Sequence, residues 1–116
     1  MLRRAEEMTR DVREKMRGGD GEVEILHIFE TDEIKGKARL FARLRLARGC
    51  SIGYHEHAGE EEIFYIIAGR GVVSDGGEEH EVGPGDAVLT GGGAGHSVRN
   101  DREEPLEIMA VILLTD

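Results

Sequence analysis

Apolar and polar residues alternate in several short stretches of the chain. In the stretch RLFARLRL, which begins at residue 39, every second position is apolar: Leu40, Ala42, Leu44 and Leu46. Side chains two apart in a β-strand lie on the same face, so this pattern predicts a strand with one face turned toward a core. The opposite face carries Phe41 and three arginines. We interpret that face as a solvated or subunit-covering surface, with anion binding as the alternative.

Glycine-rich segments separate these stretches at regular intervals. The 116 residues include 17 glycines, which is about twice the usual share, and the segments between them are rich in Val, Ile, Leu, Phe and Tyr. Short strands with turn residues between them are typical of a closed barrel or jelly roll, so the predicted fold class is all-β. The predicted strands are roughly 22–30, 38–47, 50–57, 61–68, 70–75, 78–82, 86–90, 96–101 and 105–114.

The N-terminal residues show a different pattern. The segment LRRAEEMTRDVREKM, which begins at residue 2, contains good helix formers but no sustained apolar stripe. We predict a short helix or an arm packed on a neighbour. Arg17 is interpreted as a solvated side chain, with contact to a ligand as the alternative. The expected division is an N-terminal arm over 1–21 and one β-barrel domain over 22–116, because no linker is long enough to separate two domains.

Charge and composition argue against several classes of function. The formal net charge is -9 and the aromatic residues are two tyrosines and three phenylalanines, so nucleic acid has neither a basic stripe nor much stacking surface to bind. The longest apolar run, 108–114, is shorter than the roughly 20 residues that span a bilayer, and the N-terminus lacks the apolar region of a secretory signal. We therefore expect a soluble, cytoplasmic protein. The single cysteine, Cys50, agrees with a reducing compartment and is predicted to be an apolar filler in a strand.

The stretch GYHEHAGEEEIF, residues 53–64, combines two histidines with a run of three glutamates. Residues two apart in a strand are about 6.6 Å apart on the same face, so His55 and His57 can converge on one point beside a sheet. Imidazole nitrogens bond metals such as zinc at about 2.0–2.1 Å, which is within reach of two side chains so placed. A lone His-x-His pair is a weak signal, and a polar strand end is the alternative.

Two longer motifs contain this pair and a third histidine. They read GCSIGYHEHAGEEEIFYIIAG and GDAVLTGGGAGHSVRN and together span residues 49–100. This arrangement resembles the cupin superfamily, whose motifs are G(x)5HxH(x)3,4E(x)6G and G(x)5PxG(x)2H(x)3N. The one departure is Gly91, where the second motif usually has proline. That proline is a turn residue and not a ligand, so the departure bears on the stiffness of the turn.

The resemblance implies a double-stranded β-helix, also called a jelly roll or cupin barrel, with one divalent transition metal ion per chain. The positions that match the cupin metal ligands are His55, His57, Glu62 and His96. Three imidazoles and one carboxylate suit Mn, Fe, Co, Ni, Cu or Zn, and they leave two positions open if coordination is octahedral. A small anion with adjacent oxygens could occupy both.

Glu60 and Glu61 compete with Glu62 for the ligand role. The six residues that the motif places between ligand and glycine select Glu62. Glu60 has the same strand parity but comes earlier, in the expected turn, whereas Glu61 should face away. We interpret both as solvent-exposed, with general-base function as the alternative.

The remaining candidates are given structural roles. His80 is predicted to lie on the surface of a hairpin, and His27 to pack within the sheet or at its edge. Tyr54 and Glu56 should face away from the histidine pair. On the strand of Glu62, parity predicts that Phe64 and Ile66 line the pocket. Asn100 is predicted to form hydrogen bonds within its turn.

Several functions are compatible with these features, and no residue is assigned a catalytic role. The leading hypothesis is a metal-dependent enzyme of the isomerase, decarboxylase or lyase type that acts on a small oxygen-rich anion such as a hydroxy, keto or sugar acid. The alternatives are a metal-dependent dioxygenase and a non-catalytic module that binds or senses a small molecule. We also expect a homodimer, because cupins commonly cover exposed strand edges with a second subunit.

Overall fold

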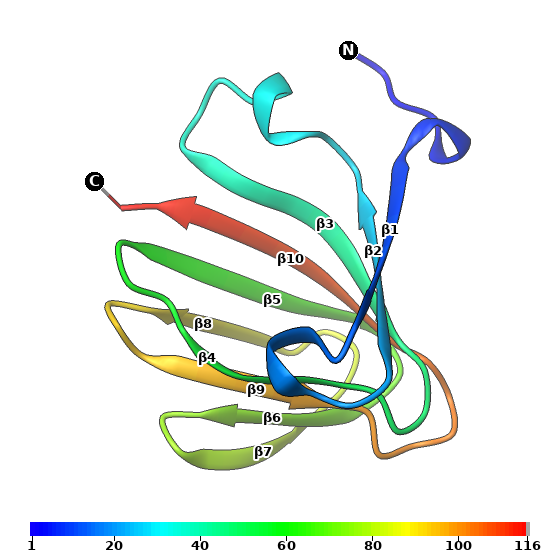
Figure 1. Ribbon diagram of the computed structural model, residues 1–116, viewed down its shortest axis with the longest axis vertical. Helices are drawn as coiled ribbons and strands as arrows, with labels where there is room; N and C mark the ends of the chain where they lie inside the picture. The colour runs from blue at the N-terminus through cyan, green and yellow to red at the C-terminus, as the bar shows by residue number, and fades with distance from the viewer. Residues whose placement is uncertain (116) are drawn as a thin grey trace.

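The protein consists of two antiparallel β-sheets that face each other across one core. A computed structural model describes residues 1–115, and Figure 1 shows the arrangement of their strands. One sheet has the strand order β1-β2-β3-β10-β5-β8 and the other the order β4-β9-β6-β7. The strands are β1 (Thr9–Glu14), β2 (Glu22–His27), β3 (Ala38–Leu46), β4 (Ser51–Glu56), β5 (Glu60–Ala68), β6 (Gly71–Asp75), β7 (Glu78–Val82), β8 (Ala87–Gly91), β9 (Gly95–Arg99) and β10 (Leu106–Leu114). The predicted all-β jelly roll is therefore confirmed.

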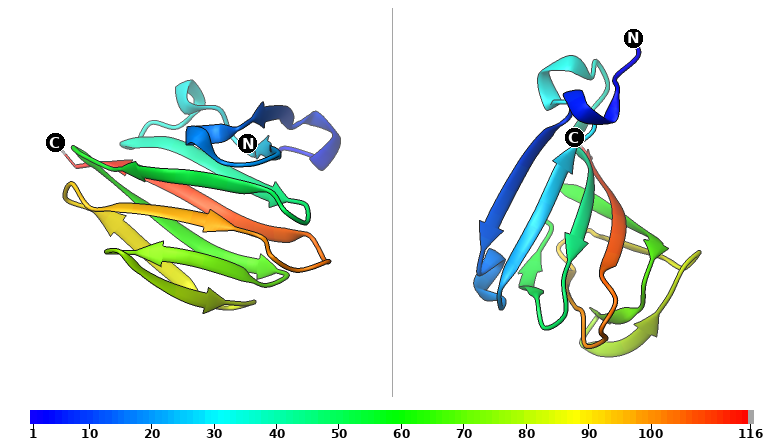
Figure 2. Two further views of the ribbon diagram at one scale, coloured as in Figure 1. Left: turned by 60° about the horizontal axis from the view of Figure 1, so that its bottom comes forward. Right: turned by 90° about the vertical axis from the view of Figure 1, so that its right-hand side faces the viewer.

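The N-terminal residues form a short 3-10 turn and a strand. The turn η1 (Ala5–Glu7) precedes β1, and β1 pairs antiparallel with β2 from Thr9 opposite His27 to Glu14 opposite Glu22. Figure 2 shows the two strands side by side at one edge of the larger sheet. Without an apolar stripe a helix here would have no packed face, whereas the strand gains a full set of ladder hydrogen bonds. The division at residue 22 stays a prediction.

Two further 3-10 turns, η2 (Met16–Gly18) and η3 (Thr31–Glu33), join β1 to β2 and β2 to β3. No helical segment within residues 1–115 is long and apolar enough to cross a membrane.

The core is formed by alternate residues of the long strands. On β3, Ala42, Leu44 and Leu46 are buried and Leu40 packs against them, as the alternation predicts. On β10 the buried positions are Leu106, Ile108, Ala110 and Ile112. Full burial of each large apolar side chain contributes about 1.5–3 kcal/mol, so the paired central strands hold the sheet together.

Strand register brings distant parts of the chain to one end of the barrel. On the smaller sheet β4 pairs with β9, and His55 lies directly opposite His96. On the larger sheet β5 pairs with β8, and Glu62 lies opposite Thr90. Both strand pairs present these side chains to the space between the sheets.

The turn between β8 and β9 forms without the proline of the motif. Gly91 ends β8 opposite Glu61, and the next residues, Gly92 and Gly93, have φ angles of 66° and 88°. Glycine adopts such left-handed angles without steric cost, so these two residues turn the chain toward β9 and His96.

Candidate metal centre

Four side chains from three strand regions meet between the sheets. His55 lies on β4, His57 follows the end of that strand, His96 lies on β9 and Glu62 comes from the opposite sheet on β5. One nitrogen or oxygen atom from each lies within 4.8 Å of the others, and all but the partly buried His55 are buried. We call these residues the four candidate ligands. The motif spacing selected the same group, and their role as metal ligands stays a proposal.

Hydrogen bonds determine the tautomers of two imidazole rings. Nδ1 of His55 lies 2.8 Å from the carbonyl oxygen of Gly53, and Nδ1 of His57 lies 2.5 Å from a carboxylate oxygen of Glu60. Both partners can only accept, so each Nδ1 carries the proton and donates it. The Nε2 atoms of both rings therefore point their lone pairs toward the centre of the group, as metal-binding imidazoles do.

Five distances within the group are short enough for bonds to one shared ion. Nε2 of His96 lies 3.0 Å from Nε2 of His57 and 3.1 Å from Nε2 of His55. Oε1 of Glu62 lies 3.0 Å from Nε2 of both His57 and His96 but 4.0 Å from Nε2 of His55. Atoms bonded to one ion at about 2.1 Å lie at most about 4.2 Å apart, so these five separations are compatible with one ion.

A transition-metal ion with six coordination positions, held by these four side chains, would keep two positions free for a ligand. Three imidazole nitrogens and a carboxylate are a donor set for a divalent transition metal, and such an ion would supply Lewis-acid polarisation of a bound oxygen.

The carboxyl group of Glu62 is held in its charged form. Burial raises the pKa of Glu62, but the interactions with His55 and His96 outweigh burial and bring the pKa down to about 2. A buried carboxylate needs positive charge nearby, so this group suits a cation at the centre.

Packing, and not a hydrogen bond, orients the ring of His96. Its Nδ1 is buried and has no hydrogen-bond partner among residues 1–115. The ring of Phe64 stacks on it with a centroid distance of 4.7 Å and an interplanar angle of 12°. Phe64 also lines the cavity beside the candidate ligands, as its strand parity predicts.

Glu60 is not the exposed turn residue that the sequence interpretation favoured. It begins β5, its side chain is only 14% exposed, and Arg39 binds its two carboxylate oxygens at 2.9 Å each. The hydrogen bond of Arg39, together with that of His57, lowers the pKa of Glu60 to about 2 despite partial burial. Glu60 therefore links Arg39 to a candidate ligand. Glu60 and Glu62 lie two residues apart on β5, and this shared strand parity is the sequence signal that places Glu60 on the same face as Glu62.

Replacing Glu60 by alanine should weaken the binding of a divalent metal by about 10- to 100-fold, because partners that orient a metal-binding imidazole have effects of this size. Competition with a chromophoric chelator measures the affinity. The matched control is Glu61→Ala, since Glu61 lies on the opposite face of β5 against Gly91. Equal affinities for the two variants would contradict the role given to Glu60.

The exposure of several other side chains tests further predictions made from the sequence. Tyr54 and Glu56 are exposed, as expected from their alternation with the histidines. His80 is 56% exposed in its side chain on the hairpin strand β7. Ile66, by contrast, is fully buried in the core and does not line the cavity, since it lies four residues along β5 from Glu62.

Asn100 forms the predicted local hydrogen bonds, with its Nδ2 donating to the carbonyl oxygens of Leu46 and Glu104 and its Oδ1 accepting from the amide of Arg102. Cys50 is partly buried against the core, as predicted for a filler, but it lies one residue before β4 and not within a strand.

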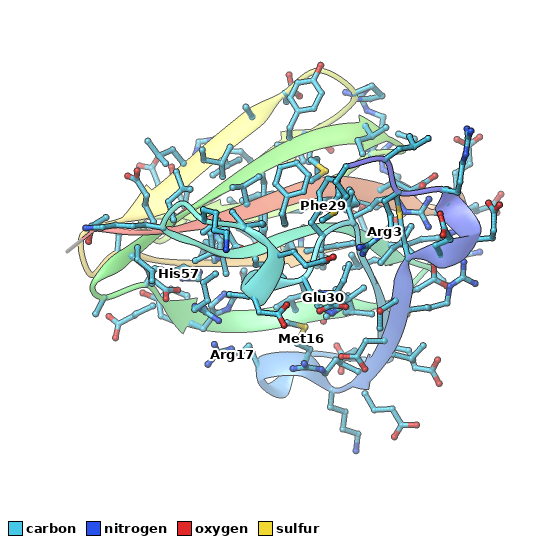
Figure 3. The ribbon with its side chains drawn as sticks, turned by 90° about the horizontal axis from the view of Figure 1, so that it is seen from above. Arg3, Met16, Arg17, Phe29, Glu30 and His57 are labelled. Carbon is cyan, nitrogen blue, oxygen red and sulfur yellow. The ribbon has the colours of Figure 1, made fainter. Side chains whose placement is uncertain are left out.

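A cavity of about 360 Å³ lies beside the four candidate ligands and contacts His55, His57 and Glu62. Its wall includes residues that the sequence analysis did not connect to the site, among them His27 on β2, Met16 and Arg17 on η2, and Arg39 on β3. Figure 3 labels Arg17, Met16 and His57, and Arg17 leaves η2 on the same side of the molecule as His57. No sequence spacing connects η2 with the motifs, so only the fold reveals this proximity.

A model of the cupin domain family matches residues 42–112, which is more than half of the chain. The protein therefore belongs to the cupin family. This match includes the four candidate ligands and the strands that carry them.

Particular relatives are also similar over most of their length. A Thermotoga maritima protein named "Oxalate-binding protein" is 44% identical over 114 residues, which cover 98% of this chain and 94% of that protein. The crystal structure of a protein from the same organism, described as a predicted oxalate decarboxylase, superposes with a TM-score of 0.94 at 43% identity and covers 99% of this chain and 100% of the other. A polyketide cyclase from Streptomyces resistomycificus, 20% identical with a TM-score of 0.78 over 100% of this chain and 81% of its own, shares the fold alone.

Proposed function

We propose that the protein binds a small dicarboxylate of the oxalate type through a divalent transition metal held by the four candidate ligands. The observation that carries this proposal is the convergence of three imidazoles and one carboxylate, which would leave two positions of a six-coordinate ion free. Two oxygens on neighbouring carbons of one anion can occupy such a pair. The 44% identity to a protein named for oxalate binding supports the same ligand class.

The charges around the cavity also favour an anion. The chain as a whole has a formal net charge of -9. The charged side chains that line the cavity are nevertheless mostly cationic: Arg13, Lys15, Arg17 and Arg39 against Glu14 and Glu62. A divalent ion would add to this local positive potential, which attracts small anions into a cleft.

The residues around the cavity support binding of an anion more directly than they support a catalysed reaction of it. A decarboxylation or isomerisation needs a group that can give or accept a proton beside the bound anion. Within the described part of the cavity wall, the carboxylates are Glu14 and Glu62, and Glu62 faces the other candidate ligands. The nearby Glu60 is engaged by Arg39 and His57.

Decarboxylation is the second candidate function. It is favoured by the 43% identity to a structure described as a predicted oxalate decarboxylase, and the cavity residues His27 and Glu14 are the titratable groups that could transfer a proton there. Conversion of oxalate to formate and carbon dioxide would be its signature.

Calorimetry with oxalate tests the binding proposal. Protein is stripped of metal and loaded in separate samples with Mn, Fe, Co, Ni, Cu or Zn. We expect saturable binding of about one oxalate per chain in at least one loaded form, and none in the stripped protein or in a His55→Ala variant. Absence of binding in every loaded form would refute the proposal. Analysis of the recovered ligand separates the candidates, because binding alone returns oxalate and decarboxylation returns formate.

The outer face of the larger sheet supports the homodimer expected from the sequence. Strand register aligns four apolar side chains across this face: Phe41, Val111, Ile63 and Leu89. Leu89 is 61% exposed, and Tyr65 and Ile67 on the same face are also exposed. We propose that a second copy covers this row, because symmetric pairing buries one apolar patch against itself.

Light scattering at micromolar concentration should give the dimer mass for the protein and the monomer mass for Leu89→Glu, which places a charge at the β8 end of this apolar row. A charge added on the other sheet, as in Tyr54→Glu at an exposed position of β4, should leave the dimer mass unchanged. A monomer mass for the unaltered protein would refute the dimer.

A further inference from the structure

The cavity is larger than oxalate requires. Its volume of about 360 Å³ falls in the range of about 300–1,000 Å³ that accommodates drug-sized organic ligands. Oxalate consists of two joined carboxylates, and both would lie at the ion. Much of the remaining wall is apolar: Ile25, Leu40, Leu44, Ile52 and Ile112. This wall favours a ligand with a hydrocarbon part that extends away from the ion.

The four cationic side chains on this wall differ in their partners. Arg13 pairs with Asp11 and Arg39 pairs with Glu60. By contrast, the side chains of Lys15 and Arg17 have no hydrogen-bond or ion-pair partner among residues 1–115. A guanidinium presents a planar set of donors that matches a carboxylate with two parallel hydrogen bonds. Arg17 is therefore available to a ligand anion.

The backbone of this segment is strained. Lys15 and Arg17 have φ angles of 50° and 55°, and within residues 1–115 they are the non-glycine residues with positive φ. A left-handed conformation is unfavourable for a residue with a Cβ, because the Cβ comes too close to the following carbonyl oxygen. Such residues persist where the surrounding structure holds them, and they concentrate at ligand-binding sites.

Close backbone contacts hold the segment against β4. A Cβ added to Gly53 would lie 2.1 Å from the carbonyl oxygen of Arg17, and one added to Gly19 would lie 2.3 Å from the carbonyl oxygen of Ser51. The amide of Ser51 donates to the carbonyl oxygen of Asp20 at 2.8 Å, and the Asp20 amide donates to the Ser51 hydroxyl at 2.8 Å. Figure 1 shows this loop between β1 and β2 reaching across to β4.

This contact gives Arg17 a defined position relative to the metal centre. Gly53, which the Arg17 carbonyl contacts, lies two residues before His55 and accepts the hydrogen bond from the Nδ1 of that histidine. The same short piece of β4 therefore supports both the candidate ligand and the strained segment. Glycine at position 17 would adopt the left-handed conformation without strain. The chain nevertheless has an arginine there, which points to a role for the arginine side chain.

We propose that Arg17 is a specificity-determining residue that binds a second anionic group of the ligand. This inference rests on the metal-dependent anion binding proposed above. The preferred ligand is then an α-oxo or α-hydroxy acid whose first end occupies the two coordination positions. Its other end carries a carboxylate that pairs with Arg17, and a short hydrocarbon spacer lies along the apolar wall. Lys15, at the same side of the cavity, adds to the positive potential.

Two pairs of matched ligands test this assignment by calorimetry on the metal-loaded protein. The pairs are 2-oxoglutarate with 2-oxopentanoate and 2-oxoadipate with 2-oxohexanoate. Within each pair the members differ only in the distal group, which is a carboxylate in the first and a methyl in the second. Because a charge-assisted bidentate contact is among the strong hydrogen bonds, we expect at least one dicarboxylate to bind at least about tenfold more tightly than its partner.

Three variants assign this preference to the side chain. Arg17→Gln and Arg17→Gly both remove the guanidinium and should abolish the preference, with oxalate affinity changed by less than about threefold. Arg17→Gly also tests folding, because glycine accepts the left-handed backbone conformation. The melting temperature of this variant should be unchanged or higher than that of the unaltered protein. Arg45→Gln, on the exposed outer side of β3, removes the same charge elsewhere and should keep the preference.

The outcomes distinguish this inference from the proposed function. If the protein binds oxalate but prefers neither dicarboxylate, or if both Arg17 variants keep the preference, the role of Arg17 is wrong and metal-dependent oxalate binding stands. If no ligand binds the metal-loaded protein, oxalate included, the proposed function itself is wrong.

Discussion

Replacement of His57 by alanine should abolish stoichiometric metal binding. The Nε2 of His57 lies 3.0 Å from both Nε2 of His96 and Oε1 of Glu62, so it is at the centre of the group. The variant loses one donor and also leaves the carboxylate of Glu60 without its imidazole partner. Since loss of a supporting contact alone costs about 10- to 100-fold, we expect loss of the ligand itself to cost at least about 100-fold in affinity for a divalent ion.

Elemental analysis after dialysis against a weak chelator measures this effect. We expect about one ion per chain in the unaltered protein, because the four candidate ligands form one group. We expect less than about a tenth of that metal content in His57→Ala. His80→Ala is the matched control, because His80 is an exposed histidine on β7, outside the group. Full metal content in His57→Ala would show that the four side chains do not act together as a metal site.

Loss of metal binding should also appear in thermal unfolding. An ion that binds only the folded protein stabilises it by about 4 kcal/mol at a thousandfold excess over its dissociation constant. Addition of metal should therefore raise the melting temperature of the unaltered protein and of His80→Ala. It should leave that of His57→Ala almost unchanged.

Replacement of Phe64 by alanine should destabilise the fold by about 3–5 kcal/mol, the usual cost of removing a buried aromatic ring. Phe64 is 1% exposed, belongs to the main apolar core and stacks on the ring of His96. The variant would leave a cavity and remove the surface that orients His96, whose Nδ1 has no hydrogen-bond partner among residues 1–115. Urea unfolding of the metal-free protein measures the core contribution separately from metal binding.

Two further variants make the Phe64 result specific. Phe64→Leu keeps an apolar side chain in the core and should cost less than about 1.5 kcal/mol while still weakening the orientation of His96. Val12→Ala, at an exposed position of β1, should change the free energy of unfolding by less than about 0.5 kcal/mol. A loss below about 1 kcal/mol in Phe64→Ala would contradict the packing described here.

Most of the strand arrangement could be predicted from local patterns. The alternation on β3 identified the buried positions, because every second side chain of a strand faces the same way. Glycines marked the turns between strands. The N-terminal strand β1 was not predicted, since its residues are mostly exposed and its stability comes from pairing with β2. A pattern of burial cannot reveal a strand that has almost no buried side chains.

The candidate ligands were also predictable, whereas their surroundings were not. Motif spacing selected four residues that the fold brings within 4.8 Å of one another. It did not identify the ion pair of Glu60 with Arg39, because those residues lie on different strands and meet only when β10 places β3 and β5 on its two sides. It also did not place Arg17 in the cavity wall, although contact with a ligand was the alternative considered for this exposed residue.

The sequence by itself determined the all-β class, the buried face of the central strands and the set of residues that could hold a metal. These features depend on the two-residue repeat of a strand and on fixed spacings within one segment of chain. Tertiary structure decided the tautomers of His55 and His57, the pairing of Glu60 and the approach of η2 to the cavity. Each of these depends on contacts between segments that are distant in the chain or on the local folding of a turn, and such contacts have no fixed spacing in a sequence.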